Sequence, residues 1–242
     1  MSCFGLIGYP LSHSLSQKLF QQQFGDTHQY NLLAYETKEH VMDLLKHSDK
    51  YAGFNVTIPY KEFVINLLDS LSSEAGDIRA VNTIFIERSG KKVGHNTDAE
   101  AFRRTLVAWL PQLPASAIIL GGGGASKAVA YALEALNIPY SVAVRSPKNP
   151  NDISYQLLKQ IGLGDFELII NTTPCGTFPN VLETPPISTD QIGDHHKIYD
   201  LVYNPSTTAL LKVALRKGAT AINGINMLEL QAKLSWKIWG LI

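Results

Sequence analysis

Short apolar runs alternate with amphipathic stretches along most of the 242-residue chain. Apolar runs of four to eight residues bounded by turn-forming residues are typical of buried strands, and stretches with apolar positions three and four apart are typical of helices. Alternating strands and helices predict an α/β fold with parallel strands and crossover connections. The predicted strands are residues 4–8, 29–36, 53–57, 84–87, 117–120, 141–144, 168–171, 198–201 and 219–222.

A break in this pattern predicts two lobes. Pro111 and Pro114 interrupt residues 109–116, just before a very apolar strand and a glycine cluster, so a second series of strands and helices begins there. We expect one lobe from residues 1–100 and another from residues 101–224, with the ligand in a cleft between them. The last helix, from about 226 to 239, could pack on either lobe.

Composition excludes several classes of partner. Lys plus Arg and Asp plus Glu both number 21, so no net charge favours nucleic acid. No apolar run approaches the roughly 20 residues that cross a bilayer. Cys3 and Cys175 lack the spacing of a disulfide framework or a metal site, and we interpret Cys175 as a small loop residue rather than a catalytic thiol. We expect a cytoplasmic protein that begins at Met1 and binds no metal.

The glycine cluster is a predicted dinucleotide-binding turn. The apolar strand 117–120 runs directly into Gly121-Gly122-Gly123-Gly124-Ala125 and then into an alanine-rich helix at 127–135. Gly121 permits a tight turn, Gly123 and Gly124 let the backbone approach a pyrophosphate, and the helix N-terminus presents free N–H groups. The flanking strand and helix make this a more specific motif than glycines alone.

Arg145 follows the next strand, where enzymes that use NAD place an acidic residue to hold the ribose hydroxyls. A guanidinium can instead bind a 2′-phosphate and stack on adenine. Arg145 therefore favours NADP, although an isolated arginine would more often be a solvated surface residue.

Ser12 and Ser14 follow the first strand, and we expect a helix to begin at Ser14 and run to about Phe24. Two hydroxyls beside a helix N-terminus suit a substrate carboxylate. The alternative that Ser14 only caps the helix stays open.

A second group of polar residues lies at predicted strand ends. Asn55, Thr57 and Lys61 surround the end of strand 53–57, and Asn82 and Asp98 flank a predicted hairpin that turns at 89–90. The carboxyl edge of an open α/β sheet is where ligands bind, and neutral amides and hydroxyls suit a polyol.

Lys61 and Asp98 could support the reduction of a ketone, which needs a hydride and a proton. A free lysine is an ammonium ion at neutral pH, so a neutral base would require desolvation, whereas a close Asp98 carboxylate favours the ammonium. Lys61 could thus act mainly as a donor and orienter. Two such charges alone would more often form an ordinary surface salt bridge.

Taken together, these segments resemble the shikimate dehydrogenase family from the first strand to the last helix. The motifs are Gly8-Tyr9-Pro10-Leu11-Ser12-His13-Ser14, Asn55-Val56-Thr57-Ile58-Pro59-Tyr60-Lys61, Ala80-Val81-Asn82-Thr83, Asn96-Thr97-Asp98 and Gly121–Ala125. The resemblance implies reversible reduction of 3-dehydroshikimate to shikimate with NADPH, in aromatic amino acid biosynthesis. It also implies a substrate-binding first lobe, a Rossmann-type doubly wound second lobe, and a C-terminal segment, residues 225–242, that packs back onto the first.

The resemblance assigns individual roles. It implies Lys61 and Asp98 as the catalytic pair. It implies substrate contacts at Ser12, Ser14, Thr57, Asn82, Tyr203 and Gln231. It implies cofactor contacts at Gly121, Gly122, Gly123, Gly124, Ala125, Arg145, Thr173, Leu201 and Gly224.

Some positions depart from the family pattern. Val144 and Ser146 flank Arg145 where an amide and a threonine are usual, which removes two groups that assist a 2′-phosphate. The rival hypotheses are a quinate or shikimate dehydrogenase that uses NAD, and a non-catalytic sensor of shikimate or a nucleotide. We expect a monomer or a homodimer with small-molecule ligands and no nucleic-acid or membrane partner.

Overall fold

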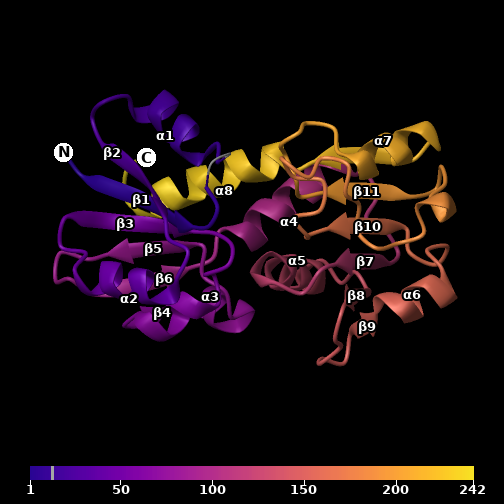
Figure 1. Cartoon of the computed structure of the whole chain (residues 1–242), viewed down its shortest axis with the longest axis horizontal. Coiled ribbons are helices and arrows are strands. Elements are labelled where there is room, and N and C mark those ends of the chain that lie inside the picture. The colour runs from indigo at the N-terminus through magenta and orange to yellow at the C-terminus, as the bar shows by residue number, and fades with distance from the viewer. Residues whose placement is uncertain (12–13) are drawn as a thin grey trace. The chain divides into compact units, whose positions relative to one another are not determined.

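The apolar strands assemble into two six-stranded sheets in the computed structural model, which describes residues 1–11 and 14–242 (Figure 1). Each sheet belongs to a compact unit. Unit 1 comprises Met1–Ala101 and Leu228–Ile242, and unit 2 comprises Phe102–Met227. The chain therefore passes between the units inside two of its helices, α4 (Asp98–Trp109) and α8 (Ile225–Ile238).

The sheet of unit 1 is mixed, with the strand order β2-β1-β3-β5-β6-β4 (Figure 1). β1, β2 and β3 are parallel, whereas β5 pairs antiparallel with both β3 and β6. A hairpin between β5 and β6 turns at Ser89 and Gly90, as the sequence predicts. The strands are β1 (Cys3–Gly8), β2 (Gln29–Ala34), β3 (Tyr51–Val56), β4 (Ser70–Leu71), β5 (Thr83–Ile86) and β6 (Lys92–His95).

Two apolar layers cover this sheet because successive side chains of a strand face opposite sides. Phe4 and Leu6 of β1 pack with α1 and α8, whereas Ile7 packs with α2, α3 and the short 3-10 helix η1. Both faces of the sheet are therefore buried under helices. The helices are α1 (Ser16–Phe24), α2 (Lys38–Lys46), η1 (Phe63–Leu67) and α3 (Ser73–Ile78).

The sheet of unit 2 is entirely parallel, with the strand order β12-β11-β10-β7-β8-β9. This is the doubly wound order, in which the direction of winding reverses between β7 and β10. Its strands are β7 (Ala117–Leu120), β8 (Tyr140–Val144), β9 (Asp152–Ser154), β10 (Leu168–Asn171), β11 (Lys197–Asp200) and β12 (Thr220–Asn223). Its remaining helices are α5 (Gly124–Ala135), α6 (Tyr155–Ile161), the 3-10 helix η2 (Thr189–Gln191) and α7 (Ala209–Arg216).

The α/β class and all nine predicted strands are confirmed, with ends that differ by up to two residues. Three further strands were not among these nine. β6 is the second strand of the predicted hairpin, and β4 and β9 are very short, so that they give no periodicity to detect. The predicted start of the first helix at Ser14 is wrong. α1 begins at Ser16, and the Ser14 hydroxyl accepts a hydrogen bond from the Ser16 backbone N–H at 3.3 Å.

Gly53 in the middle of β3 is required by close packing. A Cβ atom at this position would lie 2.4 Å from Nε1 of Trp239 and 2.6 Å from the carbonyl oxygen of Ile84. These two atoms are joined by a 3.0 Å hydrogen bond in which the indole N–H donates. The missing side chain thus lets the end of the C-terminal helical segment attach to the sheet of unit 1.

We expect Gly53→Ala to lower the free energy of unfolding by about 1–3 kcal/mol, because the added methyl overpacks a buried contact. Urea unfolding followed by circular dichroism measures the change. Gly76→Ala is the matched control, since Gly76 is exposed in α3 with open space around its Cα. It should be neutral or stabilise the protein by up to about 1 kcal/mol. Equal stability of the two variants would contradict this account.

Candidate active site

Lys61 and Asp98 form an ion pair in unit 1. Lys61 ends the turn that follows β3, where the Tyr60 N–H donates to the Thr57 carbonyl, and Asp98 is the first residue of α4. The Lys61 Nζ donates to Asp98 Oδ2 at 2.6 Å, and the two side chains are only 14% and 7% exposed. The two charges that lie 37 positions apart in the sequence are therefore brought into direct contact in a largely buried place.

Asn82 holds the second oxygen of the Asp98 carboxylate. Its Nδ2 donates to Asp98 Oδ1 at 3.0 Å and to Thr97 Oγ1 at 2.8 Å, while its Oδ1 accepts from the Thr97 N–H at 2.8 Å. Asn82 is 3% exposed, so these bonds fix its amide in one orientation. One carboxylate oxygen is thus directed at Lys61 and the other at Asn82.

Asn96 supports Asp98 from the backbone side. Its Oδ1 accepts from the N–H groups of Asp98 and Ala99 at 3.0 and 3.1 Å, and its Nδ2 donates to the Ala80 carbonyl. Asn96 therefore satisfies free N–H groups at the start of α4. The Asp98 carboxylate also lies at the N-terminal end of that helix, where the helix dipole attracts a negative charge.

Gln231 reaches this network from α8. Its Oε1 accepts from Asn82 Nδ2 at 3.4 Å, and its backbone carbonyl accepts from Thr97 Oγ1 at 3.1 Å. A residue near the end of the chain thus joins the same cluster.

A buried polar cluster beneath the site was not assigned from the sequence. Ser235 of α8 is fully buried, and its Oγ lies 3.0 Å from Asn55 Nδ2 and 2.7 Å from Thr83 Oγ1. Asn55 also accepts a hydrogen bond from the Tyr30 hydroxyl at 2.8 Å. The sequence indicates Asn55 as a polar residue at a strand end, but no local pattern identifies Ser235 as its partner.

The remaining predicted substrate residues are Ser12, Ser14, Thr57 and Tyr203. Ser12 lies outside the described residues. Thr57 lies beside Gly8, where a Cβ would be 2.3 Å from Thr57 Cγ2. Among the described residues, no hydrogen bond connects the Ser14 or Thr57 side chain to the Lys61–Asp98 cluster. Tyr203 belongs to unit 2.

The glycine turn of unit 2 lies where the sequence predicts it, between β7 and α5. Gly121 has φ +108°, a backbone conformation that favours glycine, and a Cβ there would lie 2.9 Å from Thr172 Oγ1 and 3.0 Å from Thr173 Cγ2. Gly123 precedes the first turn of α5 and has open space around it. The turn thus combines a glycine-only conformation with an accessible helix N-terminus, as a pyrophosphate requires.

Two strand ends meet at this turn because the sheet reverses its winding between β7 and β10. Open α/β sheets bind ligands at such a point, outside the carboxyl ends of the strands. Gly121 follows β7, and Thr172 and Thr173 follow β10. The Thr172 hydroxyl donates to the Leu120 carbonyl at 2.7 Å, which joins the two segments.

Arg145 is exposed directly after β8, the strand next to β7 in the sheet. Burial raises the pKa of the nearby Tyr155 hydroxyl to about 12, and the positive charge of Arg145 acts in the opposite direction. Arg145 therefore presents an exposed cation at the edge of the glycine turn, where a phosphate group could approach it.

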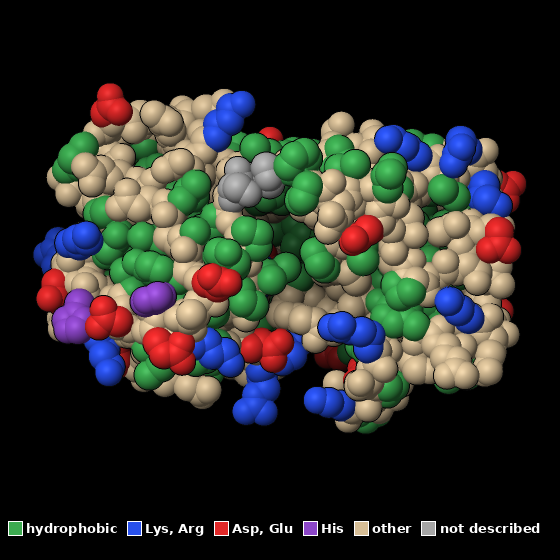
Figure 2. Space-filling model, in the orientation of Figure 1, with side chains coloured by type: hydrophobic (Ala, Val, Ile, Leu, Met, Phe, Trp, Pro, Cys, Tyr) green, Lys and Arg blue, Asp and Glu red, His purple; other side chains and the backbone are tan. Residues whose placement is uncertain are grey.

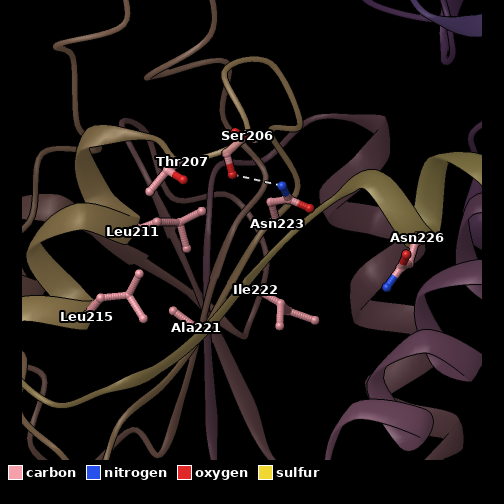
Figure 3. Close-up of a pocket in the computed structure, with 8 residues that line it drawn as sticks. All are labelled: Ser206, Thr207, Leu211, Leu215, Ala221, Ile222, Asn223 and Asn226. Carbon is pink, nitrogen blue, oxygen red and sulfur yellow. Dashed lines mark hydrogen bonds between the residues drawn. The ribbon is translucent and has the colours of Figure 1, made fainter.

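A pocket of 270 Å³ in unit 2 lies between α7 and β12 (Figure 3). Leu211 and Leu215 line one side, and on the other the Asn223 Nδ2 donates to the Ser206 carbonyl at 2.8 Å. None of the predicted cofactor or substrate residues lines this pocket. The pocket is therefore separate from the residues predicted to take part in the reaction.

Other kinds of site find no support among the described residues. They contain no group of three His, Cys, Asp or Glu side chains placed to hold a metal ion, and no helix long and apolar enough to cross a membrane. Cys3 and Cys175 are both free thiols. On the face shown in Figure 2, the acidic and basic side chains of the described residues are interspersed rather than gathered by sign.

Comparison with known proteins gives one consistent family. A family model described as the shikimate dehydrogenase substrate binding domain matches residues 6–84. The shikimate dehydrogenase (NADP(+)) of Methanococcus aeolicus is 35% identical over 253 residues, which cover 97% of this chain and 90% of the relative.

Solved structures agree over the whole chain. Shikimate 5-dehydrogenase from Thermus thermophilus, in complex with NADP(H) and shikimate, matches with a TM-score of 0.85 at 29% identity and covers 100% of this chain and 94% of its own. Quinate dehydrogenase from Corynebacterium glutamicum, in complex with NAD, matches with a TM-score of 0.86 at 25% identity and the same coverage. Given the 35% identity to a curated relative across 97% of its length, the chain belongs to the shikimate dehydrogenase family.

Proposed function

We propose that this protein reversibly reduces 3-dehydroshikimate to shikimate with NADPH, as a step in aromatic amino acid biosynthesis. The observation that carries the proposal is the Lys61–Asp98 pair, at 2.6 Å, with Asn82 on the second carboxylate oxygen. A surface salt bridge would be exposed and free to rearrange, whereas this pair is largely buried and held by neighbours. A largely buried and fixed pair of an ammonium and a carboxylate is suited to proton transfer.

Lys61 handles the proton of the reaction. In the direction of reduction, its ammonium donates a proton to the ketone oxygen while the carbonyl carbon accepts a hydride. In the direction of oxidation, the amine takes the hydroxyl proton back. The Asp98 carboxylate accepts a hydrogen bond from the Lys61 ammonium at 2.6 Å and so aims it at the substrate. The nicotinamide of NADPH, when bound, supplies the hydride.

Neutral polar groups orient the substrate. Asn82 and Gln231 present amides beside the catalytic pair, and they can exchange their mutual hydrogen bond for bonds to the ring hydroxyls of shikimate. Thr57 and Tyr203 add hydroxyls. Ser12 and Ser14 hold the carboxylate, for which a hydroxyl is a suitable donor.

The residues of unit 2 fit a dinucleotide. The backbone of Gly121, Gly122, Gly123, Gly124 and Ala125 faces the pyrophosphate at the start of α5. Arg145 binds the 2′-phosphate. Thr173, Leu201 and Gly224 complete the site on the neighbouring strand ends.

The rival functions differ in their chemistry. A quinate dehydrogenase that uses NAD would hold the ribose with an acceptor after β8, where this chain has Arg145. A non-catalytic sensor would need no buried Lys61–Asp98 pair. We also propose a cytoplasmic monomer or homodimer that binds neither nucleic acid nor membrane.

A matrix of two substrates and two cofactors tests the function. Purified protein with shikimate and NADP+ should produce reduced nicotinamide, followed at its absorbance band, at least about tenfold faster than with quinate or NAD+. The preference for NADP+ is expected because Arg145 offers a partner to the 2′-phosphate, and a charge-assisted hydrogen bond of this kind is worth about tenfold or more in binding. The preference for shikimate follows from the proposed substrate. Comparable rates with quinate and NAD+ would favour the rival dehydrogenase, and no turnover would favour the sensor.

Lys61→Ala tests the catalytic pair. We expect kcat to fall by about 10²–10⁴, the contribution of a positioned acid or base, with the affinity for shikimate largely unchanged because the lost interaction acts mostly during proton transfer. Steady-state kinetics and shikimate titration measure the two quantities. Lys46→Ala removes an exposed lysine of α2 and should leave both unchanged. Near-normal turnover of Lys61→Ala would refute the role.

Arg145→Ala tests the choice of cofactor. We expect KM for NADP+ to rise about tenfold or more, the value of a charge-assisted phosphate contact, while KM for NAD+ changes little. Lys159→Ala is the control, since it removes an exposed cation from α6 of the same unit. If KM rises equally for both cofactors, Arg145 does not recognise the 2′-phosphate.

A further inference from the structure

Two fully buried polar residues lie side by side at the ends of apolar strands in unit 2. Asn171 is the last residue of β10 and Asp200 the last residue of β11, and they are paired in the register of the sheet. The Asn171 Nδ2 donates to Asp200 Oδ1 at 2.9 Å. Burying a carboxylate costs folding free energy unless hydrogen bonds replace those it makes with water. The hydrogen-bond donors around Asp200 therefore show which segments it connects.

Asp200 receives two further hydrogen bonds, from groups beyond the strand. Its Oδ2 accepts from the Thr208 hydroxyl at 2.6 Å, and its Oδ1 accepts from the Val202 N–H at 3.1 Å. Thr208 is also fully buried and caps α7 by accepting from the Leu211 N–H at 3.2 Å. Burial raises the pKa of Asp200, and these three donors oppose that shift. The carboxylate thus joins the segment after β11 to the start of α7.

Asn171 extends the connection to the loop after β10. Its Oδ1 accepts from the Thr173 N–H at 3.0 Å and from the Thr173 hydroxyl at 2.7 Å, and its Nδ2 donates to the Cys175 carbonyl at 3.4 Å. The Cys175 N–H in turn donates to the Thr173 hydroxyl at 3.2 Å. The side chain of Asn171 therefore fixes the backbone of this loop.

The segment after β11 is also in contact with Gly224. The Val202 carbonyl accepts from the Gly224 N–H at 3.2 Å, and a Cβ at Gly224 would lie 2.1 Å from the Leu201 carbonyl oxygen. Thr173, Leu201 and Gly224 come from three separate segments. All three segments are connected, directly or through one residue, to the Asn171–Asp200 pair.

We propose that Asp200 is a positioning residue for the dinucleotide, holding the loops that carry Thr173, Leu201 and Gly224 in their binding conformation. This inference rests on the proposed function, because those three residues are cofactor contacts only if NADP binds there. Asp200 itself is fully buried and acts through its neighbours. Preorganised loops bind a ligand more tightly because less conformational freedom is lost on binding.

Asp200→Asn and Thr208→Val probe the connection in two ways. The first keeps the shape of the side chain but removes the charge that strengthens three hydrogen bonds, and the second removes the donor to Oδ2. Thr208→Ser retains the hydroxyl and should behave like the unchanged protein. Thr208→Val is decisive if Asp200→Asn does not fold.

Tyr199→Phe is the matched control for a merely structural effect. Tyr199 precedes Asp200 on β11, so its side chain faces the opposite side of the sheet. It is fully buried, and it loses one hydrogen bond, the 2.8 Å contact between its hydroxyl and Thr105 Oγ1. It therefore disturbs the same strand without touching the three loops.

The first measurement is the dissociation constant for NADP+ by titration calorimetry. We expect it to rise about tenfold in Asp200→Asn and in Thr208→Val, the loss of one hydrogen bond to a charged acceptor. The dissociation constant for shikimate should rise less than that for NADP+, because Tyr203 is the one proposed substrate residue in a segment that Asp200 holds, and the others belong to unit 1. An unchanged NADP+ affinity in both folded variants, or an equal loss in Tyr199→Phe, would overturn the proposal.

The second measurement needs no ligand and separates the two hypotheses. Amide hydrogen exchange should accelerate in Asp200→Asn at Thr173, Cys175, Val202 and Gly224, and in Tyr199→Phe it should not. If the unchanged protein fails to bind NADP+, the proposed function is wrong, and exchange alone decides whether Asp200 orders these loops. If exchange at these four amides is unaffected, the inference about Asp200 is wrong even if the enzyme oxidises shikimate.

Discussion

The need to satisfy buried polar groups at the ends of apolar strands governs both candidate sites. In unit 1, Asn82 lies just before β5 and meets this need by bonding to Asp98, Thr97 and Gln231. Each bond also fixes a group of the proposed reaction. Without such partners an amide or carboxylate in this place would cost folding free energy. The hydrogen bonds that fix the groups of the active site are thus the same bonds that stabilise the fold.

In unit 2, the buried polar groups at strand ends lie beside the proposed cofactor residues. Its sheet reverses its winding between β7 and β10, which leaves strand ends open toward a ligand. Gly121 adopts there a backbone conformation that favours glycine. The Asn171–Asp200 pair forms hydrogen bonds to the segments that follow β10 and β11. Backbone N–H groups and a single cation can then recognise phosphates without a dense positive charge, which agrees with the equal numbers of acidic and basic residues.

The sequence predicted repetitive features well and long-range partners poorly. Strand positions, the hairpin at Ser89-Gly90 and the glycine turn follow from local patterns, so they were predicted within a few residues. The start of α1 was predicted two residues too early, at Ser14, whereas the helix begins at Ser16, whose backbone N–H donates to the Ser14 hydroxyl. The roles of Ser235 and Asp200 were missed because a buried polar residue gains meaning only from its partners.

By itself the sequence determined the fold class, the place of the dinucleotide turn, and the family, because these depend on local spacing and residue type. Only the tertiary structure decided which polar residues meet. Lys61 and Asp98 are 37 positions apart, and Asn82 and Gln231 are 149 apart. Hydrogen bonds act over about 3 Å, and that closeness is created by strand order and helix packing rather than by distance along the chain. The pairing of charges into one buried cluster is therefore a property of the fold.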